Sequence, residues 1–286
     1  MKTFWNWDIH YACNYRCSYC FLAGKWDVAA EANRYPGTEK WVEAWGRIYD
    51  KYGACHIHLS GGEPSAYPDF FGLLQYLNEK FTLQVSTNLT FDVAGFVKKF
   101  DPERIKLDAS FHPEFADFNR FLADILSLKN NNFTVSVSFV AYPPHLERVD
   151  SLKKHFSENG VRFIVQPFRG EYQGRKYPDG YTEDEKNLLR RCGEDILSTK
   201  DMVRYHLDTK QAEARLCHMG QRYGKIYASA DVHRCCSTGV KKIGNLLNDP
   251  DFALLDKPEI CEVADCICWR RMVVGEESKW SPHWQQ

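Results

Sequence analysis

The sequence predicts an α/β protein, a partial (β/α)6 barrel followed by a small cysteine-rich C-terminal domain. Strand-like apolar runs alternate with amphipathic helix patterns over the first two thirds of the chain, an order that gives parallel strands in right-handed βα units. Six such units are too few to close an eightfold barrel. From about residue 205 the chain changes to short strands, turns and six cysteines. We therefore expect two domains, 1–204 and 205–286.

The individual elements follow from apolar periodicity and turn residues. An alternating run covers 3–11, and a loop with room for one helical turn covers 22–36. Thr38 is expected to cap a helix whose apolar face includes Trp41 and Trp45. Further strands are expected at 55–60, 82–86, 104–111, 133–141 and 161–166, with helices at 69–80, 91–100, 114–129 and 146–159.

A connector rich in Gly, Pro and Tyr follows at 170–184. It leads into a helix expected at 182–197, in which Thr182 and Glu185 have the spacing of a capping box. Its aromatic and basic side chains would either line a sugar pocket or form a surface loop; they are Tyr172, Arg175, Lys176, Tyr177 and Tyr181.

Composition excludes several classes of protein. The chain has 286 residues, and its 37 basic residues balance 38 acidic ones, so no nucleic-acid partner is expected. No run of 18 apolar residues is present, so no membrane partner is expected and a cytoplasmic location is predicted. The 11 cysteines then indicate metal binding rather than disulfides, because the cytosol keeps thiols reduced.

Three cysteines lie close together after the first predicted strand, in the pattern Cys13-x3-Cys17-x2-Cys20. Thiolates are soft ligands that hold iron–sulfur clusters. Three ligands on a four-iron cubane leave one iron open to bind a further molecule. The alternatives are a structural zinc loop or three unrelated buried thiols. Zinc sites usually pair two C-x2-C or Cys/His knuckles, so the spacing favours the cluster.

This loop, with Tyr19 before its last cysteine and Phe21 after it, resembles the cluster motif of the radical S-adenosylmethionine (SAM) enzymes. The resemblance implies a TIM-like partial barrel and a 4Fe-4S cluster on Cys13, Cys17 and Cys20, with Tyr19 beside the cofactor. The open iron would chelate SAM, and electron transfer would cleave SAM to methionine and a 5′-deoxyadenosyl radical that abstracts a substrate hydrogen. A low-potential electron donor such as flavodoxin or ferredoxin is implied as a partner.

Further polar groups stand where strands are expected to end, the edge at which such sheets carry their active sites. Gly61-Gly62-Glu63-Pro64 follows the second strand; adjacent glycines let a backbone approach a ligand, and a carboxylate accepts from an ammonium group. The resemblance implies that this turn holds the amino group of SAM. The other candidates for cofactor binding are Ser86, Asn88 (with Thr87 between them), Ser110 and Ser138, with Gln166 weaker.

Asp108 and His112, near the end of the fourth strand, are candidates for substrate contact. As for each serine above, the alternative is that these polar groups only satisfy the strand ends.

The C-terminal segment contains Cys217, Cys235, Cys236, Cys261, Cys266 and Cys268. Cys217 and Cys235 flank an expected hairpin at 224–234. This arrangement resembles the twitch domain, a shortened SPASM domain that binds an auxiliary 4Fe-4S cluster, and its Cys-x17-Cys spacing resembles that of the family's 2-deoxy-scyllo-inosamine dehydrogenase. The resemblance implies Cys217, Cys235, Cys266 and Cys268 as ligands, with Cys261 as replacement. The final group of three cysteines departs from the family's pair, and zinc would use the same residue types.

A spare thiol could return a hydrogen atom to a substrate radical, as in radical epimerases. Cys236, Cys192 and Cys261 are the candidates, although Cys192 lies in an expected helix and plain burial is favoured there. Cys55, at a strand start, is expected in the core.

The predicted function is that of a radical SAM oxidoreductase or epimerase acting on a sugar or aminocyclitol-like small molecule. If the second cluster accepts an electron the outcome is oxidation, and if a thiol returns hydrogen it is epimerisation. The alternative is a maturase or epimerase of a ribosomally made peptide. The barrel pattern begins at residue three without a leader-recognition domain, which we expect to favour a small polar substrate or short peptide. A non-catalytic iron–sulfur redox protein is a third reading, which the SAM-binding turn argues against.

Overall fold

A nine-stranded sheet forms the frame of the protein in the computed structural model, which describes residues 3–193, 203, 207, 216–237, 239–261 and 263. The strand order is β12-β11-β10-β1-β2-β3-β4-β5-β6. Strands β1 to β6 pair in parallel with their sequence neighbours, which confirms the predicted α/β fold. They are β1 (Phe4–His10), β2 (His56–Gly61), β3 (Thr82–Thr87), β4 (Ile105–Ser110), β5 (Thr134–Ala141) and β6 (Arg162–Pro167).

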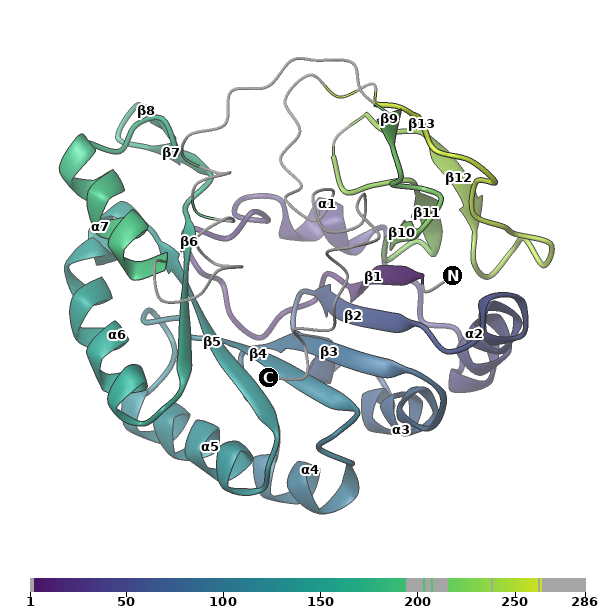
Figure 1. Cartoon of the computed structure of the whole chain (residues 1–286), viewed down its shortest axis with the longest axis horizontal. Coiled ribbons are helices and arrows are strands. Elements are labelled where there is room, and N and C mark those ends of the chain that lie inside the picture. Colours follow the sequence, from purple (N-terminus) through teal and green to yellow (C-terminus); the bar gives the residue numbers. More distant parts are fainter. Residues whose placement is uncertain are drawn as a thin grey trace.

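Apart from the first helix, which lies within the curve, the helices lie along the outer side of this curved sheet, as Figure 1 shows. They are α1 (Trp26–Ala30), α2 (Thr38–Tyr52), α3 (Phe70–Lys80), α4 (Val93–Lys99), α5 (Phe118–Asn130), α6 (Val149–Glu158) and α7 (Glu183–Gly193), with short 3-10 turns η1 (Pro64–Ala66) and η2 (Pro143–Arg148). No helix among the described residues is long and apolar enough to cross a membrane.

The core between sheet and helices is aromatic where β1 meets α2. Trp7 of β1 packs on Trp41 and Trp45 of α2, with ring centroids 4.5 and 5.4 Å apart, and Trp5 meets Trp45 at 6.0 Å. Such rings bury large apolar areas and dominate core energetics. Because side chains alternate along a strand, the residues between them, Asn6 and Asp8, lie on the opposite, inner face of the sheet.

Two helix starts illustrate how local chemistry sets boundaries. Thr38 does not cap α2 as predicted: Gly37 is the N-cap, and the Thr38 hydroxyl instead donates to Asp69 Oδ2 at 2.7 Å. The capping box before α7 is confirmed. There the Thr182 N–H donates to Glu185 Oε2 at 2.7 Å, and the Glu185 N–H donates to Thr182 Oγ1 at 3.3 Å.

The connector after β6 contains a hairpin that the sequence reading missed, β7 (Gly170–Tyr172) and β8 (Arg175–Tyr177). Gln173 and Gly174 form its turn, with φ of 47° and 71°, the left-handed values that two-residue hairpins require. The Gln173-Gly174 pair was the available signal, since the short segments on either side of it show no apolar alternation. Tyr177 and Tyr181 are buried in the core, so they do not line an open sugar pocket.

The C-terminal segment extends the barrel sheet beyond β1. Strand β10 (Tyr223–Ile226) pairs in parallel with β1, and β11 (Asp231–His233) and β12 (Lys242–Asn245) follow in antiparallel order. The predicted hairpin after Cys217 is therefore confirmed. Strands β9 (Leu216–Cys217) and β13 (Glu259–Ile260) form a separate pair. The division at 204/205 remains a prediction, since one continuous sheet includes strands from both sides of it.

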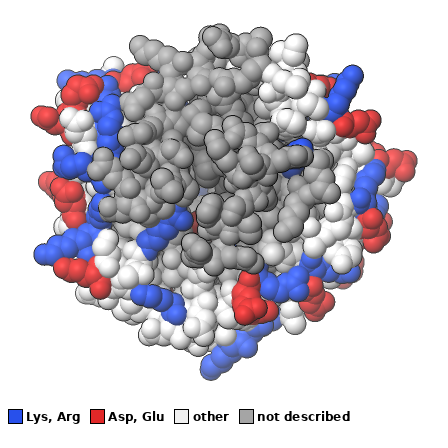
Figure 2. All heavy atoms as spheres, in the orientation of Figure 1, with Lys and Arg blue, Asp and Glu red and all other residues white. Residues whose placement is uncertain are grey.

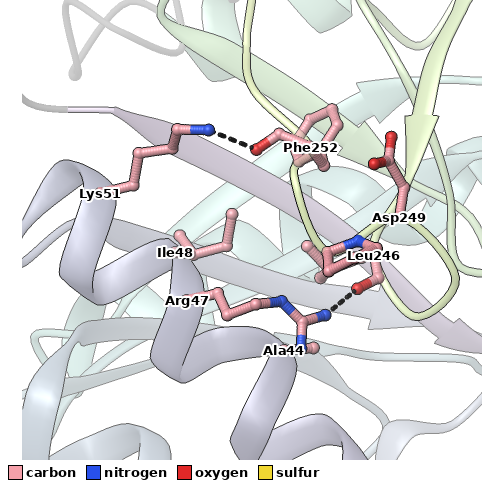
Figure 3. Close-up of a pocket in the computed structure, with 8 residues that line it drawn as sticks. Ala44, Arg47, Ile48, Lys51, Leu246, Asp249 and Phe252 are labelled. Atoms are coloured by element: carbon pink, nitrogen blue, oxygen red, sulfur yellow. Dashed lines mark hydrogen bonds between the residues drawn. The ribbon is translucent and has the colours of Figure 1, made fainter.

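The chain after β12 is anchored on helix α2. The Arg47 guanidinium donates to the Leu246 carbonyl at 2.9 Å, and the Lys51 ammonium donates to the Phe252 carbonyl at 2.9 Å. Figure 3 shows both side chains reaching from α2 across a small crevice to this segment. Helix α2 thus contacts both the aromatic core of the barrel and the C-terminal segment.

Charged side chains of both signs are interspersed around the described rim of the face in Figure 2. This distribution agrees with the balanced composition of 37 basic and 38 acidic residues.

A buried ion pair joins the two parts of the sheet across β1 and β10. Lys225 Nζ lies 2.6 Å from Asp8 Oδ1, and the two side chains are 6% and 13% exposed. Lys225 also donates to Asn6 Oδ1 at 2.7 Å. Removing one partner of a buried pair leaves the other charge uncompensated in a medium of low dielectric constant.

We predict that Lys225→Met lowers the free energy of unfolding by about 3–5 kcal/mol, measured by anaerobic urea unfolding. The control is Lys242→Met, whose ammonium pairs with Asp231 while its side chain is 52% exposed; its loss should cost less than about 1 kcal/mol. Equal losses in the two variants would contradict a special role for the Asp8–Lys225 pair.

Candidate active site at the carboxyl ends of the strands

A cysteine loop, residues 11–25, leaves the carboxyl end of β1 and carries three free thiols, Cys13, Cys17 and Cys20. A tight turn brings the Cys20 N–H to the Cys17 carbonyl at 3.1 Å. The backbone N–H groups of Tyr15 and Leu22 point at sulfur, 3.4 Å from Cys13 Sγ and 3.4 Å from Cys20 Sγ. Hydrogen bonds to cysteine sulfur of this kind tune iron–sulfur clusters.

The thiols of this loop are protonated unless a cation is present. Burial raises the pKa of all three, that of Cys17 to about 12. The Glu63 carboxylate and the Cys20 thiolate raise the pKa of Cys13 further, and the Glu114 carboxylate and the Cys20 thiolate raise that of Cys17. The thiols are therefore close enough to repel one another when ionised. A bound cationic metal centre would reverse this balance and release the protons. The donor set thus fits a thiolate-ligated cluster.

Side chains from the segments that follow β4 and β5 hold this loop in place. The Glu114 carboxylate, after β4, accepts from the Ser18 N–H at 2.8 Å and from the Ser18 hydroxyl at 2.5 Å. His145 Nε2 lies 3.5 Å from the same carboxylate. Glu114 and His145 were not identified from the sequence, because no local pattern connects them to a loop that lies far earlier in the chain, 96 residues before Glu114 in the case of Ser18.

Two predicted site residues meet beside the loop. The Tyr19 hydroxyl lies 3.1 Å from His112 Nδ1. Burial lowers the pKa of His112 to about 4, so its ring is neutral near pH 7. His112, a candidate substrate contact, is thus engaged with the cysteine loop in this structure.

The two glycines after β2 allow the backbone to approach the cysteine loop closely. A Cβ on Gly61 would lie 2.1 Å from the His10 carbonyl oxygen, and one on Gly62 would lie 2.0 Å from that of Ala12. Gly61 also has φ of +129°, a conformation that favours glycine. The Gly62 N–H donates to His10 O at 2.8 Å and the Glu63 N–H to Ala12 O at 2.9 Å. These glycines are therefore needed to join the two strand ends, besides any role toward a ligand.

The Glu63 carboxylate lies at the centre of the strand ends and is 1% exposed. Its Oε1 accepts from the Ser65 N–H at 3.1 Å, the Ser65 hydroxyl at 2.7 Å and the Thr87 hydroxyl at 2.7 Å, while Oε2 accepts from the Asn88 N–H at 2.7 Å. Burial raises its pKa, although these hydrogen bonds act in the opposite direction. The carboxylate ties the end of β2 to the end of β3. Pro64 opens the 3-10 turn η1 that holds Ser65.

Asn88 connects this network to the cysteine loop, since its side-chain amide donates to Asn14 Oδ1 at 2.8 Å. Thr87 was noted in the sequence motif but was not selected as a site residue. In the structure its hydroxyl donates a hydrogen bond to the Glu63 carboxylate.

The remaining predicted residues lie on the inner face of the sheet. Ser86 Oγ is 2.7 Å from His58 Nε2, and Ser110 is level with Ser138 on the next strand. Asp108, one pleat deeper, accepts from the Ser136 hydroxyl at 2.7 Å and from the Gln84 amide. Asp108 is therefore held by its neighbours, and the Ser138 hydroxyl accepts from Gln166 at 3.3 Å.

The other cysteines of the chain divide into three groups. Cys217, Cys235, Cys236 and Cys261, here called the second-site cysteines, gather at a small apolar cluster with Phe4, Met219, Tyr223 and Val240. Cys192 and Cys55 are buried in the main core, as expected for structural thiols. Cys266 and Cys268 lie outside the described residues. Within the described part of the chain, no three His, Cys, Asp or Glu side chains form a site for a single metal ion.

Comparison with known families gives a match over the part of the chain that carries these residues. Residues 7–109 match the family described as the Radical SAM superfamily. This range includes the cysteine loop, the Gly61–Pro64 turn, the end of β3 and all of β4 except its last residue, Ser110. A search of curated proteins finds no match.

Solved structures of similar fold include anSMEcpe with bound AdoMet, at a TM-score of 0.60 and 16% identity over 87% of this chain and 76% of that one. Native anSMEcpe with AdoMet and a Kp18Cys peptide matches at 0.60 and 18%, covering 86% and 78%. Streptococcus suis SuiB bound to S-adenosylmethionine matches at 0.59 and 16%, covering 87% and 62%. At these identities the likeness concerns the fold.

We predict that Glu63→Gln lowers the free energy of unfolding by about 1–3 kcal/mol, because an amide nitrogen would face a buried donor that then has no acceptor. Anaerobic urea unfolding measures the loss. Glu43→Gln is the control, since the Glu43 side chain is 73% exposed and pairs with Arg47 on the helix surface. Its expected loss is about 0.5 kcal/mol or less. An equal stability of the two variants would show that the four donors to Glu63 find other partners.

Proposed function

We propose, from the radical SAM domain at residues 7–109, that this chain is an enzyme that reductively cleaves SAM and abstracts a hydrogen atom from its substrate. The observation that carries the proposal is the placement of three free thiols after β1 beside the buried Glu63 network after β2. Because the same network also ties β2 to β3, it is the match to the Radical SAM family over residues 7–109 that favours SAM chemistry over a redox protein without it.

The proposal assigns cluster binding and SAM binding to different groups of residues. Cys13, Cys17 and Cys20 would hold a 4Fe-4S cluster, with Tyr19 fixed beside it through His112. Gly61, Gly62, Glu63 and Pro64 would form the wall toward the amino group of SAM, and Ser86, Asn88, Ser110 and Ser138 would supply polar groups along the strand ends. When bound, the cluster supplies the electron that cleaves SAM to methionine and a 5′-deoxyadenosyl radical.

A second 4Fe-4S cluster at the C-terminal cysteines forms part of the proposal. Its support is the gathering of four thiols at one small apolar cluster and the buried Ser237 hydroxyl nearby in sequence, which has no hydrogen-bond partner. Such an orphan donor suits a site whose acceptor is a cluster sulfur. The electron for the first cluster would come from a flavodoxin or ferredoxin, and the second cluster would receive the electron left by substrate oxidation.

The proposed substrate is a polar small molecule, a sugar or aminocyclitol that is oxidised or epimerised. Its support is the inner face of the sheet, which presents mainly hydroxyl, amide and carboxylate groups near the strand ends, although Val140 lies beside Gln166. Those groups are Asn6, Asp8, Ser60, Ser86, Ser110, Ser138 and Gln166. Hydroxyl-rich ligands are recognised by hydrogen bonds of this kind.

A ribosomally made peptide is the second candidate. Structures of anSMEcpe with bound AdoMet also contain the peptides named Cp18Cys and Kp18Cys. A fold shared with a protein that binds peptides supports testing this substrate class, although fold alone does not fix function.

We predict that the anaerobically reconstituted and reduced protein forms 5′-deoxyadenosine from SAM, and that Cys13/Cys17/Cys20→Ala forms none because its cluster ligands are gone. Chromatographic measurement of 5′-deoxyadenosine tests this. The matched control is Cys55→Ala, which removes a thiol buried in the core and should leave product formation intact. Failure of the wild type to form product while it holds iron would remove the SAM-cleaving function.

Substrate class is tested by the same assay with aminocyclitols, sugars and short cysteine-containing peptides. A true substrate should accelerate SAM cleavage and change in mass by the loss of two hydrogens, or exchange a hydrogen with solvent. Acceleration by peptides alone would exclude the small-molecule proposal.

A further inference from the structure

Arg234 is a buried arginine that links the chain segments carrying Cys217, Cys235 and Cys261. It precedes Cys235, is 4% exposed and donates from all three nitrogens. Its Nε donates to Met219 O at 3.2 Å, and its Nη2 donates to Cys217 O at 3.3 Å and Glu259 O at 3.2 Å. Its Nη1 donates to Glu259 Oε2 at 3.2 Å and to Ile260 O at 3.3 Å.

These contacts use the fixed fork of the guanidinium group. A guanidinium has five N–H donors in one plane, and here five acceptors surround it. The acceptors belong to the chain around Cys217 and to the chain just before Cys261. One side chain therefore sets the positions of both segments relative to Cys235, without any metal.

The short ladder between β9 and β13 then places Cys261 beside Cys217. Cys217 is paired with Glu259 and Leu216 with Ile260. Side chains two apart on a strand share a face, so Cys261 continues on the face of Glu259, diagonal to Cys217. Diagonal neighbours across a ladder lie about 7–8 Å apart between Cα atoms, near enough for two thiolates to bind one cluster.

A second, independent observation concerns Ser237. Its side-chain oxygen is fully buried, its residue is 4% exposed, and it has no hydrogen-bond partner. It lies two residues after Cys235 and three before Val240, both members of the apolar cluster around the second-site cysteines. Buried hydroxyl groups are normally satisfied, so an acceptor is expected there in the loaded protein.

We propose that Arg234 is a positioning residue that prebuilds the second cluster site, and that Cys261, together with Cys217 and Cys235, is a ligand of that cluster. The inference rests on the proposed second cluster and goes beyond it by choosing Cys261. It changes the expectation from the sequence, in which Cys261 was a replacement for Cys266 or Cys268. The fourth ligand of the cluster would be another cysteine of the chain.

The test uses the full chain, reconstituted without oxygen, with iron counted per chain and the reduced clusters observed by EPR. Wild type should hold about eight irons, and Cys261→Ala about four, with the EPR signal of the first cluster retained. That retained signal shows that the barrel has folded. Cys55→Ala is the control for loss of a buried thiol and should hold about eight irons.

Cys261→Ser covers the case in which Cys261→Ala holds no iron at all. A serine oxygen can replace thiolate, so the second cluster should remain with an altered EPR signal. An unaltered second-cluster signal in Cys261→Ser, or about eight irons in Cys261→Ala, would overturn the assignment of Cys261.

Arg234→Lys tests the positioning role, because lysine keeps the charge but not the planar fork. We expect iron of the second cluster to be released to a chelator about 10- to 100-fold faster than in wild type, the usual effect of altering groups that orient metal ligands. Arg47→Lys is the matched control, since Arg47 also donates to a carbonyl of the C-terminal segment but lies away from the cysteines, and its release rate should equal that of wild type. An Arg234→Lys rate equal to wild type would overturn the positioning role.

If the chain binds no second cluster at all, the iron count of the wild type shows it. Wild type would then hold about four irons, all lost in Cys13/Cys17/Cys20→Ala, before any variant of Cys261 or Arg234 is compared.

Discussion

The pairing of β1 on both edges is the constraint on which the rest of the structure depends. On one edge β1 continues into the parallel barrel through β2, and on the other it pairs with β10 of the C-terminal segment. Its outer face carries Trp5 and Trp7 into the core with α2, and its inner face carries Asp8 to Lys225. The cysteine loop begins where this strand ends. A strand fixed on both edges and both faces gives that loop a rigid base, which is what a precisely placed site requires.

A buried carboxylate then fixes the loop's neighbours. Glu63 has lost nearly all contact with water, and four hydrogen bonds from the turn after β2 and the end of β3 offset part of the desolvation cost of its charge. Because one of those donors is the backbone of Asn88, whose side chain reaches Asn14, the carboxylate is linked to the cysteine loop through two further residues. In the proposed function, a carboxylate held in this way would be preorganised for the amino group of SAM, since the donors that surround it are already in place.

The sequence predicted those features whose chemistry is local. Alternating apolar patterns identified all six barrel strands, and the Thr182–Glu185 box identified the start of α7. The spacing of Cys13, Cys17 and Cys20 predicts a cluster site, and the structure places that loop at the carboxyl end of β1. Features that depend on distant residues were missed. Nothing near Ser18 indicates that Glu114 holds it, and nothing in the pattern of β10 indicates that it pairs with β1. The capping role assigned to Thr38 was wrong because Gly37 already occupies the cap and Asp69, from another element, takes the hydroxyl.

The same distinction separates the two cysteine sites. Three thiols within eight residues need little ordering of the chain to converge, because the loop between them is short and the entropy of closing it is small. Cys217 and Cys261 are separated by more than forty residues, so their convergence must be supported by other interactions. In the structure that support is a two-stranded ladder and one buried guanidinium with five acceptors. A site assembled from distant segments therefore depends on a residue such as Arg234, which no ligand motif would reveal.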